Sequence, residues 1–385
     1  MNLDDLKAKK ILIVSHTFVK GASQELEDFL VRNRTAIVLF IGHPLGYSKD
    51  KRSFFQQYTG GNLIVRGEAK DYNLPEIFLY VKDVSYTIYW VFKSRLKFDL
   101  LIGVDNLNAF SCLMLKWLGR GKKVVYYTID YVPRRFKNRL LNYIYHRLDT
   151  FCVIWSDVVW NVSERMIEGR EKKGVSTKYR TKQATVPIGI NYSMIKRPSY
   201  TQIDRKKVIF LGHLIEKQGV QLLIQAAPMI ISEVPDIRFE IIGGGEYEND
   251  LKRLAEDLGV QKYFEFEGLI TDRDIIEQKL RKAAIGVAPY VPFSDNFTYY
   301  SDPTKPKDYM AFGLPVIITD VPHIAKEIEE RKVGFIIKYD SNMLAEKVLT
   351  LLKDDGLYQL YRQNAIEFAS EYDWNKIFPR AFQTV

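Results

Sequence analysis

Two glycine-containing turns are the first features of this chain that could do chemistry. The segment 242–246 (IGGGE) follows an apolar run and precedes a helical pattern, and 211–214 (LGHL) makes a similar turn ahead of Gly219. Backbone N–H groups at the beginning of a helix bind phosphate, so either turn could hold a phosphate group. The alternative is a tight strand-to-helix turn that needs only the positive φ of glycine. Neither turn has the spacing of a Walker A loop or of a GxGxxG fingerprint.

Charged residues cluster ahead of an apolar strand in the segment 301–320 (SDPTKPKDYMAFGLPVIITD). Lys305, Lys307 and Asp308 lie just before the turn at 313–315, and Lys307 is expected to be solvated. An Asp-Arg-Asp sequence at 272–274 resembles a metal motif, but it precedes the helical pattern IIEQKLRK. We therefore expect a helix N-cap with an acid in the first turn there, and no metal ligand.

The elements that must position these residues alternate between strands and helices. In the first half, strands are predicted at 10–16, 36–42, 100–104 and 123–127, with helices at 22–33, 109–118 and 135–148. In the second half, strands are predicted at 208–214, 239–244, 264–270, 284–290, 315–320 and 334–339, with helices including 218–233 and 246–258. Strands separated by helices of this length predict parallel βαβ units. The expected fold class is α/β, with two Rossmann-like doubly wound parallel-sheet domains facing a cleft and ligands at the strand carboxyl ends.

The domain boundary is expected where this periodicity lapses, around 181–200, a segment that contains two prolines. The chain of 385 residues is too long for one ordinary core. We predict an N-terminal domain at 1–190 and a C-terminal domain at 191–370. A C-terminal helix at 371–385 is expected to cross back to the first domain.

Composition points to a folded protein of a reducing compartment. The chain is 46% hydrophobic and 27% charged. Cys112 and Cys152 lie in apolar surroundings and are expected to be buried thiols. The charged opening MNLDDLKAKK does not resemble a secretory signal, and no run of 18 apolar residues occurs, so a cytoplasmic location is expected.

Positive charge is concentrated in the first half of the chain. Residues 1–200 contain 33 Lys and Arg against 18 Asp and Glu, whereas the remainder contains 23 against 29. The basic half is expected to face a membrane surface, a phosphate-bearing substrate or a nucleic acid. The chain lacks zinc-finger spacing, an RNP-like aromatic motif and a long basic tail, so nucleic acid is not expected as a partner.

As an ordered set, the segments of the second half resemble the donor-binding domain of the GT-B glycosyltransferases, in particular the retaining family 4 (glycosyl transferases group 1). The resemblance runs through 212–227, 239–259, 263–270, 283–290, 302–320 and 333–352. The first half matches more loosely, and the resemblance implies that 1–190 is the acceptor-side domain and 191–370 the nucleotide-sugar-binding domain. The resemblance implies transfer of a sugar from a UDP- or GDP-linked donor to a glycan or lipid-linked acceptor, with no further cofactor. It also implies no metal, because helix N-termini and basic side chains stabilise the leaving diphosphate.

The first motif departs from the family pattern G-R-L-x-x-x-K-G. His213 stands at the arginine position and Gln218 at the lysine position, with Lys217 one place early. The segment 303–309 (PTKPKDY) fits a variant P-x-K-x-x-D-Y motif, so Lys305 is the candidate to supply the missing charge to the diphosphate. The donor-binding set implied by the resemblance is Gly21, Gly212, His213, Lys217, Gly243, Gly244, Gly245, Lys305, Asp308 and Tyr309.

Three residues are predicted to be catalytic: His16, Asp130 and Asp302. His16 and Asp130 end predicted strands, and Asp130 would be a general base in an inverting reaction or a donor-sugar contact in a retaining one. The alternatives are a packed imidazole for His16, a helix cap for Asp130 and a turn acid for Asp302. The family's first glutamate is replaced by Tyr300, and either Asp302 or Asp295 could serve the sugar end.

The segments 77–98 and 116–147 combine aromatic residues with many Lys and Arg residues. Such a surface predicts peripheral contact with an anionic membrane at its inner face. The alternative is an aromatic core with solvated cations. Two other functions fit the same architecture: a nucleotide-sugar epimerase, and a non-catalytic protein whose altered first motif no longer binds a donor.

Overall fold

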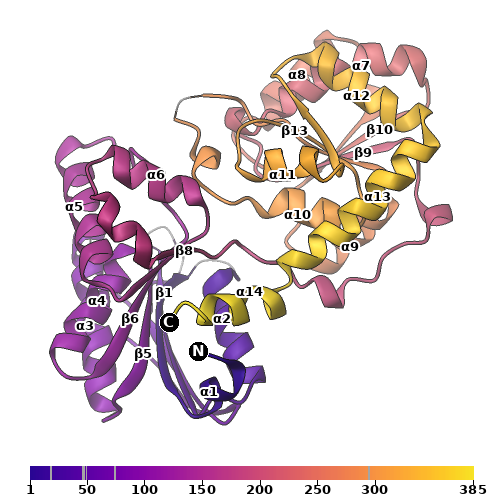
Figure 1. The fold of residues 1–385 in the computed structure, drawn as a ribbon. Helices are drawn as coiled ribbons and strands as arrows, with labels where there is room; N and C mark the ends of the chain where they lie inside the picture. The colour runs from indigo at the N-terminus through magenta and orange to yellow at the C-terminus, as the bar shows by residue number, and fades with distance from the viewer. Residues whose placement is uncertain (18–19, 46–47, 49, 73–74, 294) are drawn as a thin grey trace. The chain divides into compact units, whose positions relative to one another are not determined.

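The chain forms two compact units in the computed structural model, which describes residues 1–17, 20–45, 48, 50–72, 75–293 and 295–385. Unit 1 comprises Met1–Pro187 together with Trp374–Val385, and unit 2 comprises Ile188–Asp373 (Figure 1). Each unit has its own sheet with helices on both faces. None of the helices in the described ranges is long and apolar enough to cross a membrane.

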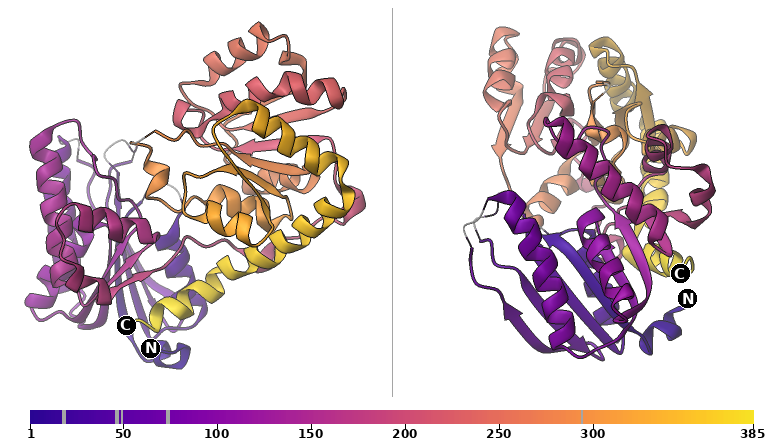
Figure 2. Two further views of the ribbon diagram at one scale, coloured as in Figure 1. Left: turned by 45° about the horizontal axis from the view of Figure 1, so that its top comes forward. Right: turned by 90° about the vertical axis from the view of Figure 1, so that its left-hand side faces the viewer.

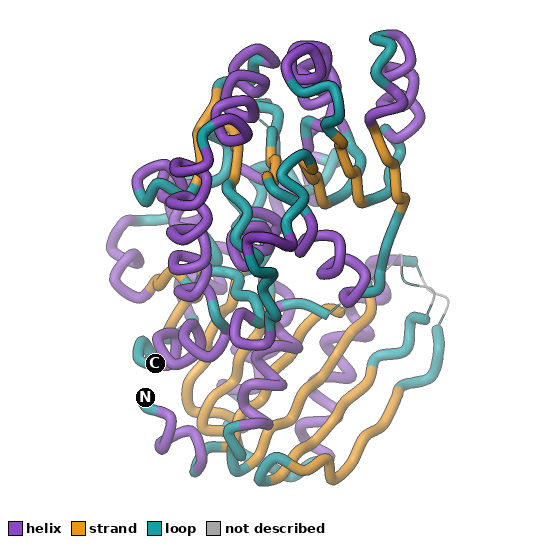
Figure 3. Tube along the Cα trace, turned by 90° about the vertical axis from the view of Figure 1, so that its right-hand side faces the viewer, coloured by secondary structure: helices purple, strands orange, loops and turns teal. Residues whose placement is uncertain are grey.

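Unit 1 is built on a sheet of eight strands in the order β4-β3-β2-β1-β5-β6-β7-β8, whose strands lie side by side in Figure 3. The neighbours of β1 run parallel to it, whereas β3 is antiparallel to both β2 and β4. The strands are β1 (Lys10–Thr17), β2 (Ile37–Pro44), β3 (Phe54–Thr59), β4 (Asn62–Glu68), β5 (Phe98–Val104), β6 (Gly121–Thr128), β7 (Val158–Asn161) and β8 (Gln183–Thr185).

The helices of unit 1 cover both faces of this sheet. Helices α3, α4 and α5 lie side by side on one face, and α2 and α14 pack together on the other (Figures 1 and 2). Their bounds are α1 (Leu3–Lys7), α2 (Ala22–Arg32), α3 (Glu76–Lys93), α4 (Asn106–Trp117), α5 (Arg139–Trp155), α6 (Glu164–Lys172) and α14 (Trp374–Phe382), and unit 1 also has a 3₁₀ turn, η1 (Thr177–Lys182). The next 3₁₀ turn, η2 (Tyr192–Met194), belongs to unit 2. The C-terminal helix α14 joins this unit because Phe378 and Phe382 stack against Phe29 of α2.

Unit 2 has a six-stranded parallel sheet in the order β11-β10-β9-β12-β13-β14. The strands are β9 (Lys207–Leu211), β10 (Arg238–Ile242), β11 (Phe264–Gly268), β12 (Ile285–Ala288), β13 (Val316–Thr319) and β14 (Gly334–Ile337). The helices are α7 (Val220–Glu233), α8 (Glu248–Asp257), α9 (Arg273–Lys282), α10 (Thr304–Ala311), α11 (Ile324–Glu330), α12 (Ser341–Lys353) and α13 (Asp355–Ala369), and the 3₁₀ turns are η3 (Tyr200–Gln202), η4 (Glu216–Gln218), η5 (Gln261–Tyr263), η6 (Phe297–Tyr299) and η7 (Ser370–Tyr372).

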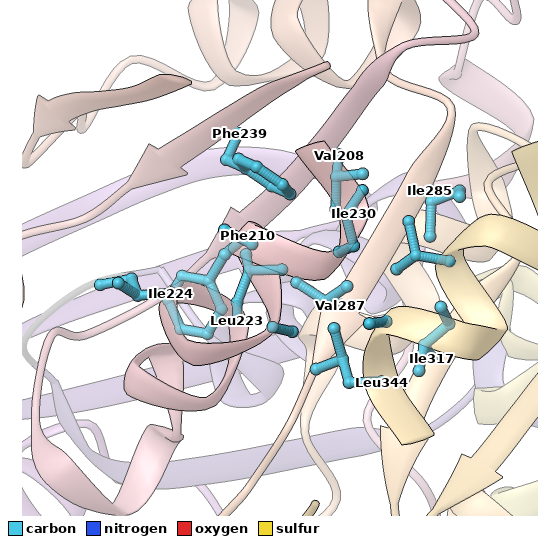
Figure 4. Packing of buried hydrophobic residues seen from close by; sticks show 14 of the residues in the cluster. Val208, Phe210, Leu223, Ile224, Ile230, Phe239, Ile285, Val287, Ile317 and Leu344 are labelled. Atoms are coloured by element: carbon cyan, nitrogen blue, oxygen red, sulfur yellow. The ribbon is translucent and has the colours of Figure 1, made fainter. Parts of the chain in front are cut away.

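The core of unit 2 explains why its strands read as nearly continuous apolar runs. A strand of a parallel sheet is buried on both faces, so both sets of alternating side chains must be apolar. Figure 4 shows Phe210 and Val287 of the sheet packed against Leu223 of α7 and Leu344 of α12. All four side chains are buried.

The prediction of two α/β parallel-sheet domains is confirmed, and each of the ten predicted strands has a counterpart. The strands β3, β4, β7 and β8 were not predicted, and β3 and β4 form an antiparallel hairpin at one edge of an otherwise parallel sheet. Cys112 and Cys152 are buried free thiols, as expected. Asp272 is the N-cap of α9 and accepts a hydrogen bond from the Asp274 N–H, as the sequence predicts.

Candidate functional site

The strand order of unit 2 reverses between β9 and β12, because the chain leaves β9 toward β10 on one side and returns through β12 on the other. In open parallel sheets a crevice lies outside the strand carboxyl ends at such a point. Ligands of open parallel sheets bind where the strand order reverses in this way. The backbones of β9 and β12 pair only as far as Gly286. Beyond that point the Tyr309 hydroxyl bridges them, accepting from the Leu211 N–H (2.7 Å) and donating to the Val287 carbonyl (3.3 Å).

Tyr309 is therefore a buried wedge at this crevice, with its hydroxyl engaged by backbone groups on both strands. Gly286 makes room for it, since a Cβ there would lie 2.3 Å from the tyrosine ring. If Tyr309 contributes to donor binding as predicted, it would do so by holding β9 and β12 in position.

Lys305 lies one turn before Tyr309 on α10, a helix that begins after Pro303. Its ammonium donates to the Gln218 side-chain carbonyl at 2.8 Å and lies 4.0 Å from the Phe210 ring centre. Burial lowers the pKa of Lys305 from 10.5 to about 7. Within the described residues the structure shows no carboxylate paired with this amine. A buried amine with a lowered pKa and no carboxylate partner is a candidate binding residue for an anion.

Lys305 stays the predicted substitute for the lysine that the first motif lacks. Gln218 stands at that family position, and the Lys305 amine reaches its amide from a residue 87 positions away in the chain. The nearby Lys217 is directed elsewhere, because its amine pairs with Asp295 at 2.8 Å. His213 is exposed.

The two glycine turns pack directly against one another at the ends of β9 and β10. Gly212 and Gly243 both have φ of +146°, and a Cβ on Gly243 would lie 1.8 Å from the Gly212 carbonyl oxygen. A Cβ on Gly245 would lie 2.2 Å from the Leu214 carbonyl oxygen. Backbone packing alone therefore requires glycine at 243 and 245.

Some of the N–H groups in these turns are already used by the protein. The Gly212 N–H donates to the Ile242 carbonyl and the Gly243 N–H donates to the Gly268 carbonyl, each at 2.9 Å. For the N–H groups of Gly244 and Gly245 the structure shows no acceptor among the described residues. These two N–H groups could therefore donate to a phosphate.

Asp308, predicted to bind the donor, is buried and paired with Arg273. The Arg273 guanidinium donates to one oxygen of Asp308 at 2.7 Å and also contacts Glu277 at 3.2 Å. The sequence predicted for Arg273 only a place in the N-cap segment 272–274. Its contact with Asp308 joins residues 35 positions apart and has no signature in the local sequence.

The expectation for Lys307 is wrong. Its side chain is fully buried, and its amine contacts Asp302 at 2.5 Å and the Ile188 carbonyl at 2.6 Å. Asp302 also accepts from the Ile188 N–H at 2.6 Å. Burial raises the pKa of Asp302 and lowers that of Lys307, and each charge offsets part of the other's burial cost. This pair holds residue 188, the first residue of unit 2, to α10; the catalytic role of Asp302 stays a prediction.

In unit 1, His16 lies at the end of β1 within a network of polar side chains. The Asn108 amide donates both to the Val104 carbonyl and to His16 Nδ1 (3.0 Å), so the imidazole carries its proton on Nε2, which faces Asp83 at 3.3 Å. Both ring nitrogens are thereby engaged. His43, which pairs in register with His16, contacts the other oxygen of Asp83 at 3.3 Å.

Asp83 is the centre of this network and was missed by sequence reasoning. Burial alone would raise its pKa, but hydrogen bonds from His16 and His43 outweigh that effect and hold the pKa of Asp83 below its usual range. Burial lowers the pKa of His43. The available signal was that His16 and His43 end adjacent parallel strands and so reach the same edge of the sheet.

Asp130 follows β6 and is 63% exposed, with Arg135 at 3.5 Å. Its neighbour Asp105 follows β5 and accepts from the N–H groups of Ile129 and Asp130. Asp105 has φ of +64°, which is rare for a residue with a side chain, and burial together with the Asp130 charge raises its pKa to about 6. A strained carboxyl with a raised pKa at a strand end is a functional candidate that sequence reasoning also missed.

The remaining predicted residue of unit 1, Gly21, is the N-cap of α2. Its φ of −142° is extended backbone, and its N–H donates to the Gln24 side chain at 3.0 Å. Gly21 is exposed, and its predicted approach to the donor phosphates stays a prediction.

A carboxylate cluster of Glu240, Glu265 and Glu267 in unit 2 has the ligand types of a metal site. Lys207 and Lys279 each contact Glu240, at 3.0 and 2.7 Å, and Lys279 also contacts Glu267. These ammonium groups already neutralise most of the cluster's charge, so its donor set does not favour a divalent cation.

Residues 205–354, which include the crevice and α10, match the family described as glycosyl transferases group 1. A phosphatidyl-myo-inositol mannosyltransferase of Mycobacterium leprae is 27% identical over 208 residues, which are 52% of this chain and 53% of the relative. The chain spans about half the length of the curated relatives it matches.

Solved structures resemble the chain over nearly all of its length. Sucrose-phosphate synthase from Thermosynechococcus elongatus has a TM-score of 0.72 with 15% identity, covering 98% of both chains. HepE of Anabaena, solved in complex with UDP, has a TM-score of 0.70 with 16% identity, covering 97% of this chain and 99% of HepE. At these identities the likeness establishes the fold, which is GT-B.

Proposed function

We propose that this protein is a GT-B glycosyltransferase of the group 1 family that transfers a sugar from a nucleotide-sugar to a glycan or lipid-linked acceptor. The observation that carries the proposal is Lys305, a buried cation without a carboxylate partner in the described residues, at the crevice where the strand order of a parallel sheet reverses. Support comes from the family match of the surrounding domain and from the fold.

In the proposed reaction, the protein stabilises the negative charge that develops on the leaving nucleoside diphosphate. The Lys305 ammonium would face the diphosphate from one side. The N–H groups of Gly244 and Gly245 would donate to its oxygens from the glycine turn. Fixed donors stabilise such charge without reorganising, which is why the proposal needs no metal.

The nucleoside would be held by the same end of α10. Asp308 would accept from the ribose hydroxyls, and the Arg273 guanidinium fixes the position of its carboxylate. The proposal includes both UDP and GDP as the nucleotide of the donor. Of the similar structures, HepE was solved with UDP. The relative from Mycobacterium leprae is named for a phosphatidylinositol acceptor, which supports a lipid-linked acceptor at a membrane face as the finer proposal.

We propose that the reaction retains the anomeric configuration. His16 has both ring nitrogens engaged by Asn108 and Asp83, so it is not suited to removing a proton from a substrate hydroxyl. An inverting reaction would instead use Asp130 as base, and replacing a general base typically costs 10²–10⁴-fold in rate. Asp130→Asn with a small loss of rate and a product of retained configuration by NMR would support retention.

The experiment that tests the function is a donor screen with a defined readout. The protein's thermal unfolding is followed with UDP, GDP and their sugars, because a ligand that binds the folded state raises the transition temperature. The nucleotide that gives the largest shift is then tested as a sugar donor with glycan and lipid-linked acceptors. No shift with any nucleotide would support a non-catalytic protein, and an epimer formed from donor alone would support an epimerase.

A further inference from the structure

The first two turns of α5 expose apolar side chains to solvent, although the helix lies on a sheet. A helix in this position should turn apolar residues to the sheet and polar residues to solvent. In α5 the outward stripe is Leu140, Tyr143 and Ile144, which are 66%, 61% and 51% exposed. Leu141 beside them is 43% exposed.

This stripe lies inside a segment with only positive charges. Residues 131–148 contain Arg134, Arg135, Lys137, Arg139 and Arg147 and no Asp or Glu. The five cationic side chains are exposed, and Arg135 contacts Asp130 at 3.5 Å. For the other four the structure shows no ion pair within the described ranges.

A second apolar stripe begins at the same edge of the sheet. Ile77, Phe78 and Val81 of α3 are 61%, 56% and 61% exposed. Helices α3 and α5 flank α4, which packs against both, and each leads into a strand of the same parallel sheet. Their first turns are therefore directed to one rim of unit 1, the rim formed by the carboxyl ends of the strands (Figure 1).

We propose that residues 134–147 are a docking surface for the anionic face of a lipid bilayer, into which Leu140, Tyr143 and Ile144 insert. Exposed aliphatic and aromatic side chains lose water contact in the interfacial region, and flanking Lys and Arg residues bind anionic headgroups. Charge complementarity selects this partner, because four of these cations have no ion pair in the described residues and favour an extended anionic surface. The inference extends the proposed function by placing a lipid-linked acceptor near the docked surface, but the contact itself can be tested without any transfer reaction.

The test is sedimentation of the full chain with vesicles of phosphatidylcholine, with and without phosphatidylglycerol. We expect capture by the anionic vesicles at low salt and release at high salt. Each cation near such a surface contributes about fivefold to partitioning, so Lys137→Gln with Arg139→Gln should weaken binding about 25-fold. Leu140→Ser with Ile144→Ser should weaken it about tenfold or more.

Matched controls separate this segment from general effects of charge and hydrophobicity. Lys172→Gln with Lys173→Gln removes the same charge from another exposed part of unit 1, and Leu360→Ser removes an exposed leucine from unit 2. Both controls should bind vesicles like the unaltered protein. Because all the altered side chains are exposed, thermal unfolding should be unchanged in every variant.

Insertion is measured separately from adsorption. An environment-sensitive fluorophore on Ile144→Cys should shift to the blue on anionic vesicles, and Cys112 and Cys152 are buried and will not compete for the label. No capture at low salt, or equal losses in the control variants, would overturn the proposal. Capture without a blue shift would overturn insertion, and nucleotide binding that persists in that case would leave the proposed function intact.

Discussion

Lys305 provides the sharpest test of the proposed donor site, because the structure predicts both its affinity for a diphosphate and its proton balance. Its pKa is lowered from 10.5 to about 7 by burial. Charging this amine inside the fold is therefore less favourable than in the unfolded chain, by on the order of 5 kcal/mol. A diphosphate bound beside it would offset that cost.

The magnitude follows from the geometry of the crevice. One negative charge about 4 Å from the ammonium attracts it by roughly 4 kcal/mol at an effective dielectric constant of about 20. At about pH 8, protonating the amine first costs about 1.4 kcal/mol. The net gain of about 2.6 kcal/mol corresponds to roughly 80-fold in affinity for the diphosphate, and none of it applies to the nucleoside alone.

The assay is titration calorimetry of UDP and GDP in buffers of different ionisation enthalpy. At about pH 8 the free protein carries a mostly neutral Lys305, so binding should take up close to one proton. Affinity should weaken about tenfold for each pH unit above about 7, up to the pKa of the bound state. In Lys305→Met, proton uptake should disappear and diphosphate binding should fall roughly 80-fold, whereas uridine or guanosine binding should not change.

The same substitution has a second, opposite effect on the free protein. Because the folded-state pKa is depressed, the unfolded state binds more protons between about pH 7 and pH 10.5, and the stability contribution of Lys305 rises with pH across that window. Lys305→Met removes the cost of burying the charge, so it should stabilise the free protein and flatten this dependence. Lys326→Met, at an exposed position, is the matched control. Equal weakening of nucleotide and nucleoside, or unchanged proton uptake in Lys305→Met, would refute the reasoning.

Three further predictions concern the support of the site. Asp302→Asn and Lys307→Met should each destabilise the protein by about 3–5 kcal/mol in denaturant unfolding, and the double variant by clearly less than their sum, because each single change leaves a buried charge without its partner. Gly243→Ala should cost about 1–3 kcal/mol or more, since φ is +146° and the Gly212 carbonyl occupies the space of a Cβ; wild-type stability would contradict the packing of the two turns. Asp83→Asn should remove stability that is present above about pH 4 and lost as the pH falls further, because the pKa of Asp83 is depressed in the fold; acid unfolding curves that superimpose would rule this out.

Much of the fold could be predicted because its determinants are local. A strand buried on both faces is largely apolar, so β9 and β13 stand out as short runs rich in β-branched residues. The helices between them show periodic apolar positions. The hairpin of β3 and β4 was missed because its residues are half-buried or exposed and carry little apolar pattern.

The candidate site was only partly visible in the sequence, because its contacts join distant residues. Lys305 meets Gln218 across 87 positions, and Lys307 meets the Ile188 carbonyl across 119. Lys307 was expected to be solvated because charged residues near a turn usually are. Burial between α10 and residue 188 reverses that expectation, and no local pattern records it.

The sequence by itself determined the two parallel-sheet domains, the order of their elements and the stretch of α10 where charge accumulates, because propensity and periodicity act over a few residues. Only the tertiary structure decided which charge faces the crevice and which is neutralised. Lys305 and Lys307 are two residues apart on one helix and contact different partners: the Lys305 amine contacts the Gln218 amide, whereas the Lys307 amine is paired with the Asp302 carboxylate. The physical reason is that burial and ion pairing depend on what the fold packs against each side chain, and these neighbours come from remote parts of the chain.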